Sequence, residues 1–200
     1  MFAQNGQKTN GYLVVGATGC GKSTWLANLS KKSKCNVIVY KHLATIDDNA
    51  FDFLKLENIK NFKIQPGIYK KCKMGGYNHH QYIEFLEFVK KNYRNGILII
   101  DDATIFERDR LSVEMNFLLT MKRHLGLDIF LVYHGLTLLP IEQFLLCKQI
   151  ILFNTTDSLK YKASRLPKYE ALVKGINLAR ANFRNQNIKI KYSPIIVNLE

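Results

Sequence analysis

The sequence predicts a three-layer α/β fold, with a mostly parallel sheet and helices on both of its faces. Short apolar runs alternate along the chain with segments of helical spacing. The first run is followed by a glycine-rich loop, and the run at 97–100 ends in two aspartates. With 200 residues, the chain suits a single domain over 1–200, with a core over about 11–160 and a basic helix and closing strands over 168–199.

Each expected element rests on its apolar pattern. Strands are expected where apolar residues run without interruption, and helices where they recur every three or four residues. Residues 43–65 are ambiguous, with a helix start at Asp47-Asp48 and a strand at 62–64, whereas the Gly- and Lys-rich segment 66–78 is the clearest loop. The expected strands are 12–15, 37–40, 97–100, 128–133, 149–153, 188–192 and 195–199, and the expected helices are 23–32, 79–92, 111–125, 139–147 and 168–184.

The charge is strongly one-sided, because 29 Lys and Arg stand against 16 Asp and Glu, a net charge of +13. This excess predicts a polyanionic partner such as nucleic acid, phosphates or an acidic membrane face, although a basic surface that only maintains solubility would give the same count. The 47% hydrophobic content excludes a disordered polyelectrolyte. No apolar run approaches the ~18 residues of a membrane span, and the start of the chain lacks the apolar core of a signal peptide. Four scattered cysteines without C-x-x-C spacing predict reduced thiols.

The first expected strand leads into a full match to the phosphate-binding pattern G-x-x-x-x-G-K-S/T. Glycines let backbone N–H groups turn inward toward phosphate oxygens, and the following helix adds its positive dipole end. We expect the lysine to reach the β- and γ-phosphates of ATP and the serine hydroxyl to bind Mg²⁺. The expected nucleotide-binding residues are Gly16, Ala17, Thr18, Gly19, Cys20, Gly21, Lys22, Ser23 and Thr24.

Two later strands end in side chains that suit the same site. Asp101 is expected to hold Mg²⁺ through water, and Asp102 to orient and deprotonate the attacking water. The separation between this motif and the loop leaves room for an intervening strand, which is typical of the RecA/ASCE-like branch of P-loop NTPases. His134, after strand 128–133, could reach the γ-phosphate or its water, or it could cap the next turn.

Over about 11–160, the order of these motifs resembles the FtsK–HerA superfamily of hexameric DNA-pumping ATPases. The shared features are an arginine and a glycine, Arg123 and Gly126, before the third motif strand, a polar residue at its end, and a later strand that runs into Thr155-Thr156-Asp157-Ser158. The small size looks most like the genome-packaging ATPases of internal-membrane, double-jelly-roll viruses. Many relatives have Gln where this chain has His134, and Glu where it has Asp102.

The resemblance implies a homo-oligomeric ring, a hexamer or pentamer, that hydrolyses ATP and moves double- or single-stranded DNA. It implies capsid or portal-vertex partners and a location in the host cytoplasm or at a packaging vertex. A neighbouring subunit would supply an arginine; Arg123 matches the family position, and Arg108 and Arg110 are the other candidates, although each could be an ordinary surface residue paired with Glu107 or Asp109. The alternatives are a conjugation-type or filamentous-phage-assembly motor, a small-molecule kinase, or a nucleotide switch that does not hydrolyse ATP.

DNA contacts are expected from Lys70, Lys71 and Lys73, within a segment at 69–77 that also holds two tyrosines and two glycines. A solvated turn is the competing interpretation. The basic helix 168–184 could face DNA, a neighbouring subunit or water. Lysine contacts without a base-reading motif predict sequence-tolerant, salt-sensitive binding.

Overall fold

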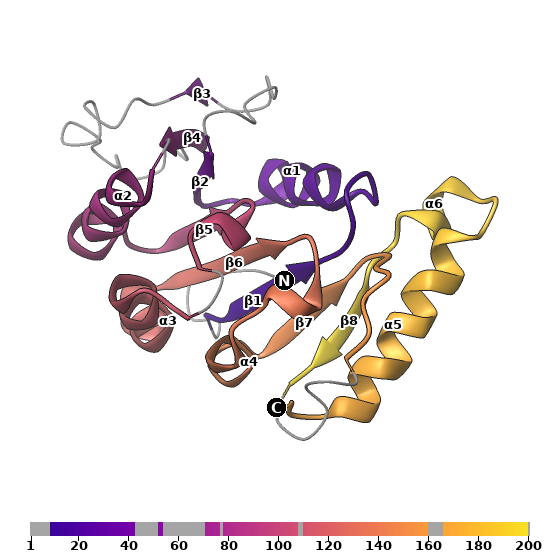
Figure 1. The fold of residues 1–200 in the computed structure, drawn as a ribbon. Helices are drawn as coiled ribbons and strands as arrows, with labels where there is room; N and C mark the ends of the chain where they lie inside the picture. The colour runs from indigo at the N-terminus through magenta and orange to yellow at the C-terminus, as the bar shows by residue number, and fades with distance from the viewer. Residues whose placement is uncertain are drawn as a thin grey trace.

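The computed structural model describes residues 9–42, 52–53, 71–76, 78–107, 110–159 and 166–199. In this part of the chain, eight strands form one sheet in the order β3-β4-β2-β5-β6-β1-β7-β8 (Figure 1). Every pairing is parallel except the one between β7 and β8. The predicted mostly parallel sheet is therefore confirmed.

Most elements lie where the apolar patterns place them. The strands are β1 (Gly11–Val15), β2 (Asn36–His42), β3 (Asp52–Phe53), β4 (Lys71–Gly76), β5 (Gly96–Ile100), β6 (Leu127–Tyr133), β7 (Gln149–Leu152) and β8 (Ile195–Asn198). The helices are α1 (Lys22–Lys32), α2 (His79–Asn92), α3 (Val113–Leu125), α4 (Ile141–Leu146), α5 (Tyr169–Phe183) and α6 (Ile188–Lys191), with short 3-10 helices η3 (Ala103–Ile105) and η4 (Leu136–Leu138).

Helices cover both faces of the sheet, as predicted. The larger core cluster joins one face to α2, α3, α4 and α5 through buried side chains such as Phe85, Leu118, Phe144 and Ile176. The smaller cluster joins the opposite face to α1 through Leu26 (Figure 1). The three layers follow from the strands, which are apolar on both sides and need cover on both faces. Within the described residues, no helix combines the length and apolar character that a membrane span requires.

The strand β6 lies between β1 and β5 and pairs in parallel with both. Its register aligns Tyr133 with Val15 of β1, and Leu131 with Ile100 of β5. Because all three strands run in the same direction, the residues that follow them meet at one edge of the sheet, where ligands bind in open parallel sheets. The strand that separates the two motif strands in the sheet is β6, although it follows both motifs in the sequence.

The predicted strand at 188–192 is wrong, because residues 188–191 form the short helix α6. Alternating Ile and Lys gave a pattern of period two, which is typical of a half-buried strand. In the structure Ile188 is 71% exposed and Ile190 is 41% exposed, so the alternation reflects no buried face. Asn187 begins the helix, and its side chain accepts a hydrogen bond from the Lys189 amide.

The predicted loop at 66–78 contains a strand instead, since β4 pairs in parallel with β2 and β3. A Cβ atom on Gly76 would overlap the Tyr40 hydroxyl and lie 2.9 Å from Gln81 Cβ, so glycine here leaves room for these two side chains. The glycines and lysines of this segment suggested a turn. In the structure Gly76 lies within a strand, and it is glycine because of the side chains packed against it. Asp47-Asp48, the strand expected at 62–64, and Tyr69, Lys70 and Tyr77 lie outside the described residues.

Close packing also fixes α5 on the sheet, and it generates a stability prediction. A Cβ on Gly175 would lie 2.7 Å from Val197 Cγ2 and 2.9 Å from Leu152 Cδ1. We expect Gly175→Leu to force the helix off the sheet and to lower the free energy of unfolding by about 1–3 kcal/mol in a denaturant titration. Leu178→Ala, at an exposed position of the same helix, should change it by less than about 0.5 kcal/mol. Unchanged stability of the Gly175 variant would contradict this packing.

Candidate active site

The loop between β1 and α1 takes its shape from three glycines. Gly19 and Gly21 have φ angles of 76° and 97°, in the left-handed region that glycine adopts without strain. A Cβ on Gly16 would lie 2.6 Å from Phe153 Cβ and 2.7 Å from Cys20 Sγ, so Gly16 is required for space. Gly21 provides no side-chain cap for α1 and its first turn contains no acidic residue, so the first N–H groups of this helix suit an anion.

Backbone hydrogen bonds hold this loop between the ends of two neighbouring strands. The Gly16 amide donates to the Tyr133 carbonyl at the end of β6, at 3.2 Å. The Ala17 amide donates to the Asn154 carbonyl just after β7, at 2.8 Å. The position of the loop is therefore set by the sheet.

Lys22 is buried, and its ammonium group folds back over the loop. It donates hydrogen bonds to the carbonyls of Gly16 and Ala17, and its Nζ lies 3.5 Å from His134 Nδ1. Burial lowers the pKa of Lys22 from its ordinary value because the charged form loses hydration. A phosphate group bound by the loop would offset that loss, so the environment of Lys22 favours an anionic ligand.

Asp101 and Asp102 occupy different surroundings although they are adjacent. Asp101 Oδ2 forms an ion pair with Lys41 Nζ at 2.8 Å. Asp102 has φ 52° and ψ 49°, a left-handed conformation that Asp tolerates better than most residues. Its Oδ1 atom lies 3.7 Å from His134 Nε2. The turn thus directs the two carboxylates to separate partners, which suits the separate roles predicted for them.

His134 lies at the centre of the candidate site. Its Nδ1 atom is 3.4 Å from Thr18 Oγ1 and 3.5 Å from Lys22 Nζ, while Nε2 faces Asp102. His134 therefore lies beside the loop, and its contact with a γ-phosphate stays a prediction.

The residues expected to hold Mg²⁺ lie together and have suitable chemistry. Ser23 and Asp101 line the same small cavity beside α1, and a hydroxyl and a carboxylate are the oxygen ligands that Mg²⁺ accepts together with substrate phosphates. The described residues contain no cluster of three or more His, Cys, Asp or Glu that could hold a metal without such phosphates. The donor set therefore fits a metal that binds with the nucleotide.

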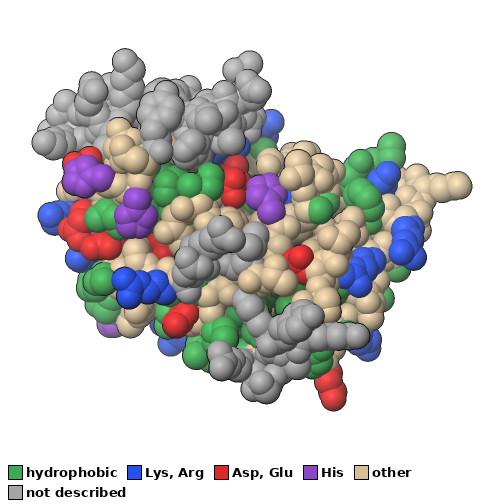
Figure 2. Space-filling view, in the orientation of Figure 1, with side chains coloured by type: hydrophobic (Ala, Val, Ile, Leu, Met, Phe, Trp, Pro, Cys, Tyr) green, Lys and Arg blue, Asp and Glu red, His purple; other side chains and the backbone are tan. Residues whose placement is uncertain are grey.

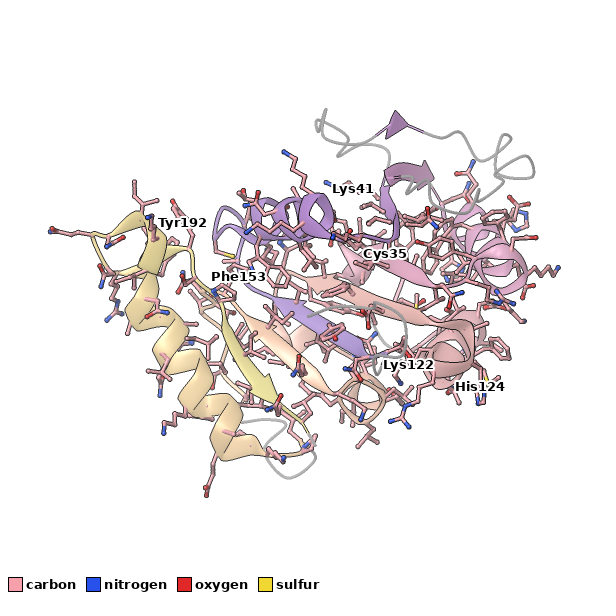
Figure 3. All side chains as sticks on the ribbon, turned by 180° about the vertical axis from the view of Figure 1, so that it is seen from behind. Cys35, Lys41, Lys122, His124, Phe153 and Tyr192 are labelled. Carbon is pink, nitrogen blue, oxygen red and sulfur yellow. The ribbon has the colours of Figure 1, made fainter. Side chains whose placement is uncertain are left out.

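Sequence reasoning did not assign Lys41 to the site, although it lines this cavity and pairs with Asp101. Figure 3 labels Lys41 near the end of β2. The sequence feature that could have identified Lys41 is its position as a charged residue directly after the apolar run 37–40. Because an ammonium group already neutralises Asp101 Oδ2, any metal held by this carboxylate would bind beside a second positive charge.

A second missed feature is a polar connection from α5 to the turn after β6. Arg180 donates from Nε to the Thr155 carbonyl and from Nη2 to the Asp157 carbonyl, both at 2.7 Å. The Asp157 carboxylate in turn accepts a hydrogen bond from the Leu136 amide. Arg180 was expected to face DNA, a neighbour or water, but it points inward and fixes the segment after β7 against the turn after β6.

The sequence left open that Glu107 pairs with a neighbouring arginine, and the structure gives its carboxylate other partners. Its side chain is buried and accepts hydrogen bonds from the Tyr82 hydroxyl, at 2.7 Å, and from the amide and hydroxyl of Ser112, both at 2.6 Å. Burial raises the pKa of Glu107. Since Ser112 begins α3, Glu107 ties the segment after the two aspartates to α2 and α3.

The remaining candidates are not brought to the site by the described part of this chain. Arg123 is exposed in the last turn of α3, at the edge of the sheet where β6 begins, whereas the phosphate loop lies where β6 ends. Arg110 is exposed just before α3, and Arg108 lies outside the described residues, as does Lys70. The backbone of Lys71 and Lys73 belongs to β4. An arginine acting in trans and DNA contacts by these lysines stay predictions.

Cys20 and Cys147 are buried free thiols, and Cys35 is buried as well. Burial raises the pKa of the Cys20 thiol in the phosphate loop. This group therefore remains a neutral packing residue next to Gly16.

The phosphate loop after β1, the aspartates after β5 and the intervening β6 define a P-loop NTPase fold. Among solved structures, the chain is similar to the genome packaging NTPase B204 from Sulfolobus turreted icosahedral virus 2. The complex of B204 with ATP-gammaS superposes with a TM-score of 0.66 at 20% identity, covering 82% of this chain and 85% of that chain. Its sulfate complex gives 0.66 at 18% identity, covering 97% and 93%.

A further similar structure is B204, the DNA-packaging ATPase from Sulfolobus Turreted Icosahedral Virus. It superposes with a TM-score of 0.58 at 18% identity, covering 82% of this chain and 85% of that chain. No protein-family model and no curated protein matches the sequence. At 18–20% sequence identity, these similarities show a shared fold.

The contact between Asp157 and Leu136 can be tested directly. Asp157→Ala would leave the Leu136 amide without its acceptor. We expect a loss of about 1–3 kcal/mol in the free energy of unfolding and faster hydrogen exchange at Leu136. Asp157→Asn keeps an acceptor oxygen and should lose less. Ser158→Ala, at the exposed neighbouring position, is the control. Unaltered exchange at Leu136 in Asp157→Ala would contradict the proposed connection.

Proposed function

We propose that this chain is an ATP-driven DNA translocase that packages a viral genome into a preformed capsid as a homo-oligomeric ring. The observation that carries the proposal is the convergence of a complete phosphate loop, two aspartates and His134 at one edge of the sheet. Support comes from the likeness in fold to the genome packaging NTPase B204, whose structures contain ATP-gammaS, AMP and AMPPCP.

In this proposal each residue of the site has a separate role in ATP hydrolysis. Lys22 and the amides at the start of α1 bind the phosphates, and Ser23 and Asp101 hold the metal. Mg²⁺, when bound, neutralises charge on the phosphate oxygens. Asp102 accepts the proton of the attacking water, while His134, between the loop and Asp102, contacts the γ-phosphate. An arginine from a neighbouring subunit, Arg123 in our proposal, stabilises the charge that develops during transfer.

DNA binding is supported by the net charge of +13, most of which lies outside the nucleotide site. Lys71 and Lys73 are in β4, which pairs with β2 so that Lys41 stands opposite Gly75. Lys41 contacts Asp101. The strand with the candidate DNA contacts is therefore the direct neighbour of the strand that touches the metal-binding carboxylate, which gives DNA a short route to influence ATP turnover. The proposal places the ring in the host cytoplasm or at a packaging vertex, with capsid or portal-vertex partners.

The effect of DNA on ATP turnover tests the proposed function. Because translocation couples hydrolysis to a polyanion, we expect double- or single-stranded DNA to change the rate of phosphate release, and the effect to fade as salt rises. Lys22→Ala should show no turnover and serves as the control. If DNA of either strandedness leaves the rate unchanged while a small acceptor is phosphorylated, the chain is a kinase. Tight ATP binding without hydrolysis would identify a switch.

The role of Asp102 can be separated from binding. Asp102→Asn keeps the size of the side chain but removes its basicity, so we expect a loss in kcat of about 10²–10⁴-fold. ATP affinity, measured by calorimetry, should stay close to that of the unmodified chain. Asp101→Asn is the comparison, because it should instead raise the Mg²⁺ concentration needed for turnover. Hydrolysis at the normal rate in Asp102→Asn would remove this residue as the base.

A further inference from the structure

An aromatic side chain from the C-terminal part of the chain lies directly against the phosphate loop. A Cβ on Gly21 would be 3.1 Å from Cδ1, 3.4 Å from Cβ and 3.5 Å from Cγ of Tyr192. Figure 3 shows Tyr192 at the end of α6, beside the loop that enters α1. Tyr192 remains 40% exposed. A large, half-exposed ring thus borders the residue at which the phosphate-binding helix begins.

Contacts with Phe183 and Lys191 hold the Tyr192 ring in position. Tyr192 packs edge-on against Phe183 of α5, with ring centroids 6.3 Å apart, and Phe183 in turn packs on the smaller core cluster. The Lys191 ammonium lies 5.0 Å from the Phe183 ring and 5.7 Å from the Tyr192 ring. Figure 2 shows hydrophobic and basic side chains gathered over α6 and the adjoining end of α5.

The two ends of the phosphate loop face different chemistry. Asp102 and His134 follow β5 and β6, on one side of β1 in the sheet, whereas Tyr192 precedes β8, on the other side. A triphosphate that crosses the loop with its γ-phosphate toward Asp102 and His134 directs its other end toward Tyr192. That end of a nucleotide holds the ribose and the base, whose π-face stacks well on an aromatic ring.

We propose that Tyr192 is the stacking platform for the base of the bound nucleotide, and that it belongs to the same binding site as Lys22. This inference rests on the nucleotide binding included in the proposed function, but it does not depend on DNA translocation. Because stacking is available to any base, Tyr192 supplies affinity for the base as such rather than a choice between adenine and guanine.

The experiment compares a ligand that has a base with one that lacks it. ATP and inorganic tripolyphosphate, each with Mg²⁺, are titrated by calorimetry into the full chain and its variants. We expect Tyr192→Ala to weaken ATP binding roughly 5- to 100-fold, the range that alanine substitution gives for base stacking, and to leave tripolyphosphate binding unchanged. Tyr192→Phe keeps the ring and should bind ATP within about twofold of the unmodified chain. Ile190→Ala, at an exposed apolar position of the preceding helix α6, is the matched control.

Two results would overturn the inference. Unchanged ATP affinity in Tyr192→Ala would show that the ring does not touch the base. An equal loss for ATP and tripolyphosphate would show that Tyr192 acts on the shape of the phosphate loop. Failure of the proposed function gives a different result. If ATP binding depends on Tyr192 but DNA does not change the turnover rate, the base-binding site stands and the proposed DNA translocase activity is wrong.

Discussion

The parallel pairing of β6 with both β1 and β5 is the constraint on which the site depends. This pairing fixes the order of the three strands. Because the strands are parallel, the phosphate loop, the two aspartates and His134 lie together at one edge of the sheet. The hydrogen bond from the Gly16 amide to the Tyr133 carbonyl continues this pairing one step beyond the strand. The loop therefore begins from a position that the sheet has already determined, which reduces the entropy lost when it closes around an anion.

Each charged side chain of the site has a polar partner without a ligand. Lys22 lies over loop carbonyls, Asp101 is paired with Lys41, and Asp102 faces His134. Burial still disfavours the charge of Lys22, as its lowered pKa indicates. A bound triphosphate would add negative charge where two lysines are already held, so ligand binding and the rearrangement of these pairs are energetically linked.

The C-terminal part of the chain contributes to the site in two places, although the recognisable motifs end before it. Arg180 of α5 holds the segment after β7, which fixes the turn after β6 through Asp157. Tyr192, just after α6, lies against Gly21. The residues beyond 166 thus serve as a support for the phosphate loop and the turn after His134, in addition to closing the sheet with β8.

The sequence by itself determined the fold class, the phosphate loop and the two aspartates, because these depend on local patterns: apolar runs, glycine spacing and acids at a strand end. It misread 188–192, where the alternating pattern marks no buried face, and 71–76, where Gly76 leaves room for side chains that are distant in the chain. Only the tertiary structure decided the parts played by Lys41, Arg180 and Tyr192. Each acts through a partner at least 23 residues distant, and the carbonyl acceptors of Arg180 have no side-chain signature. Such contacts are set by strand order and helix packing, which no local pattern contains.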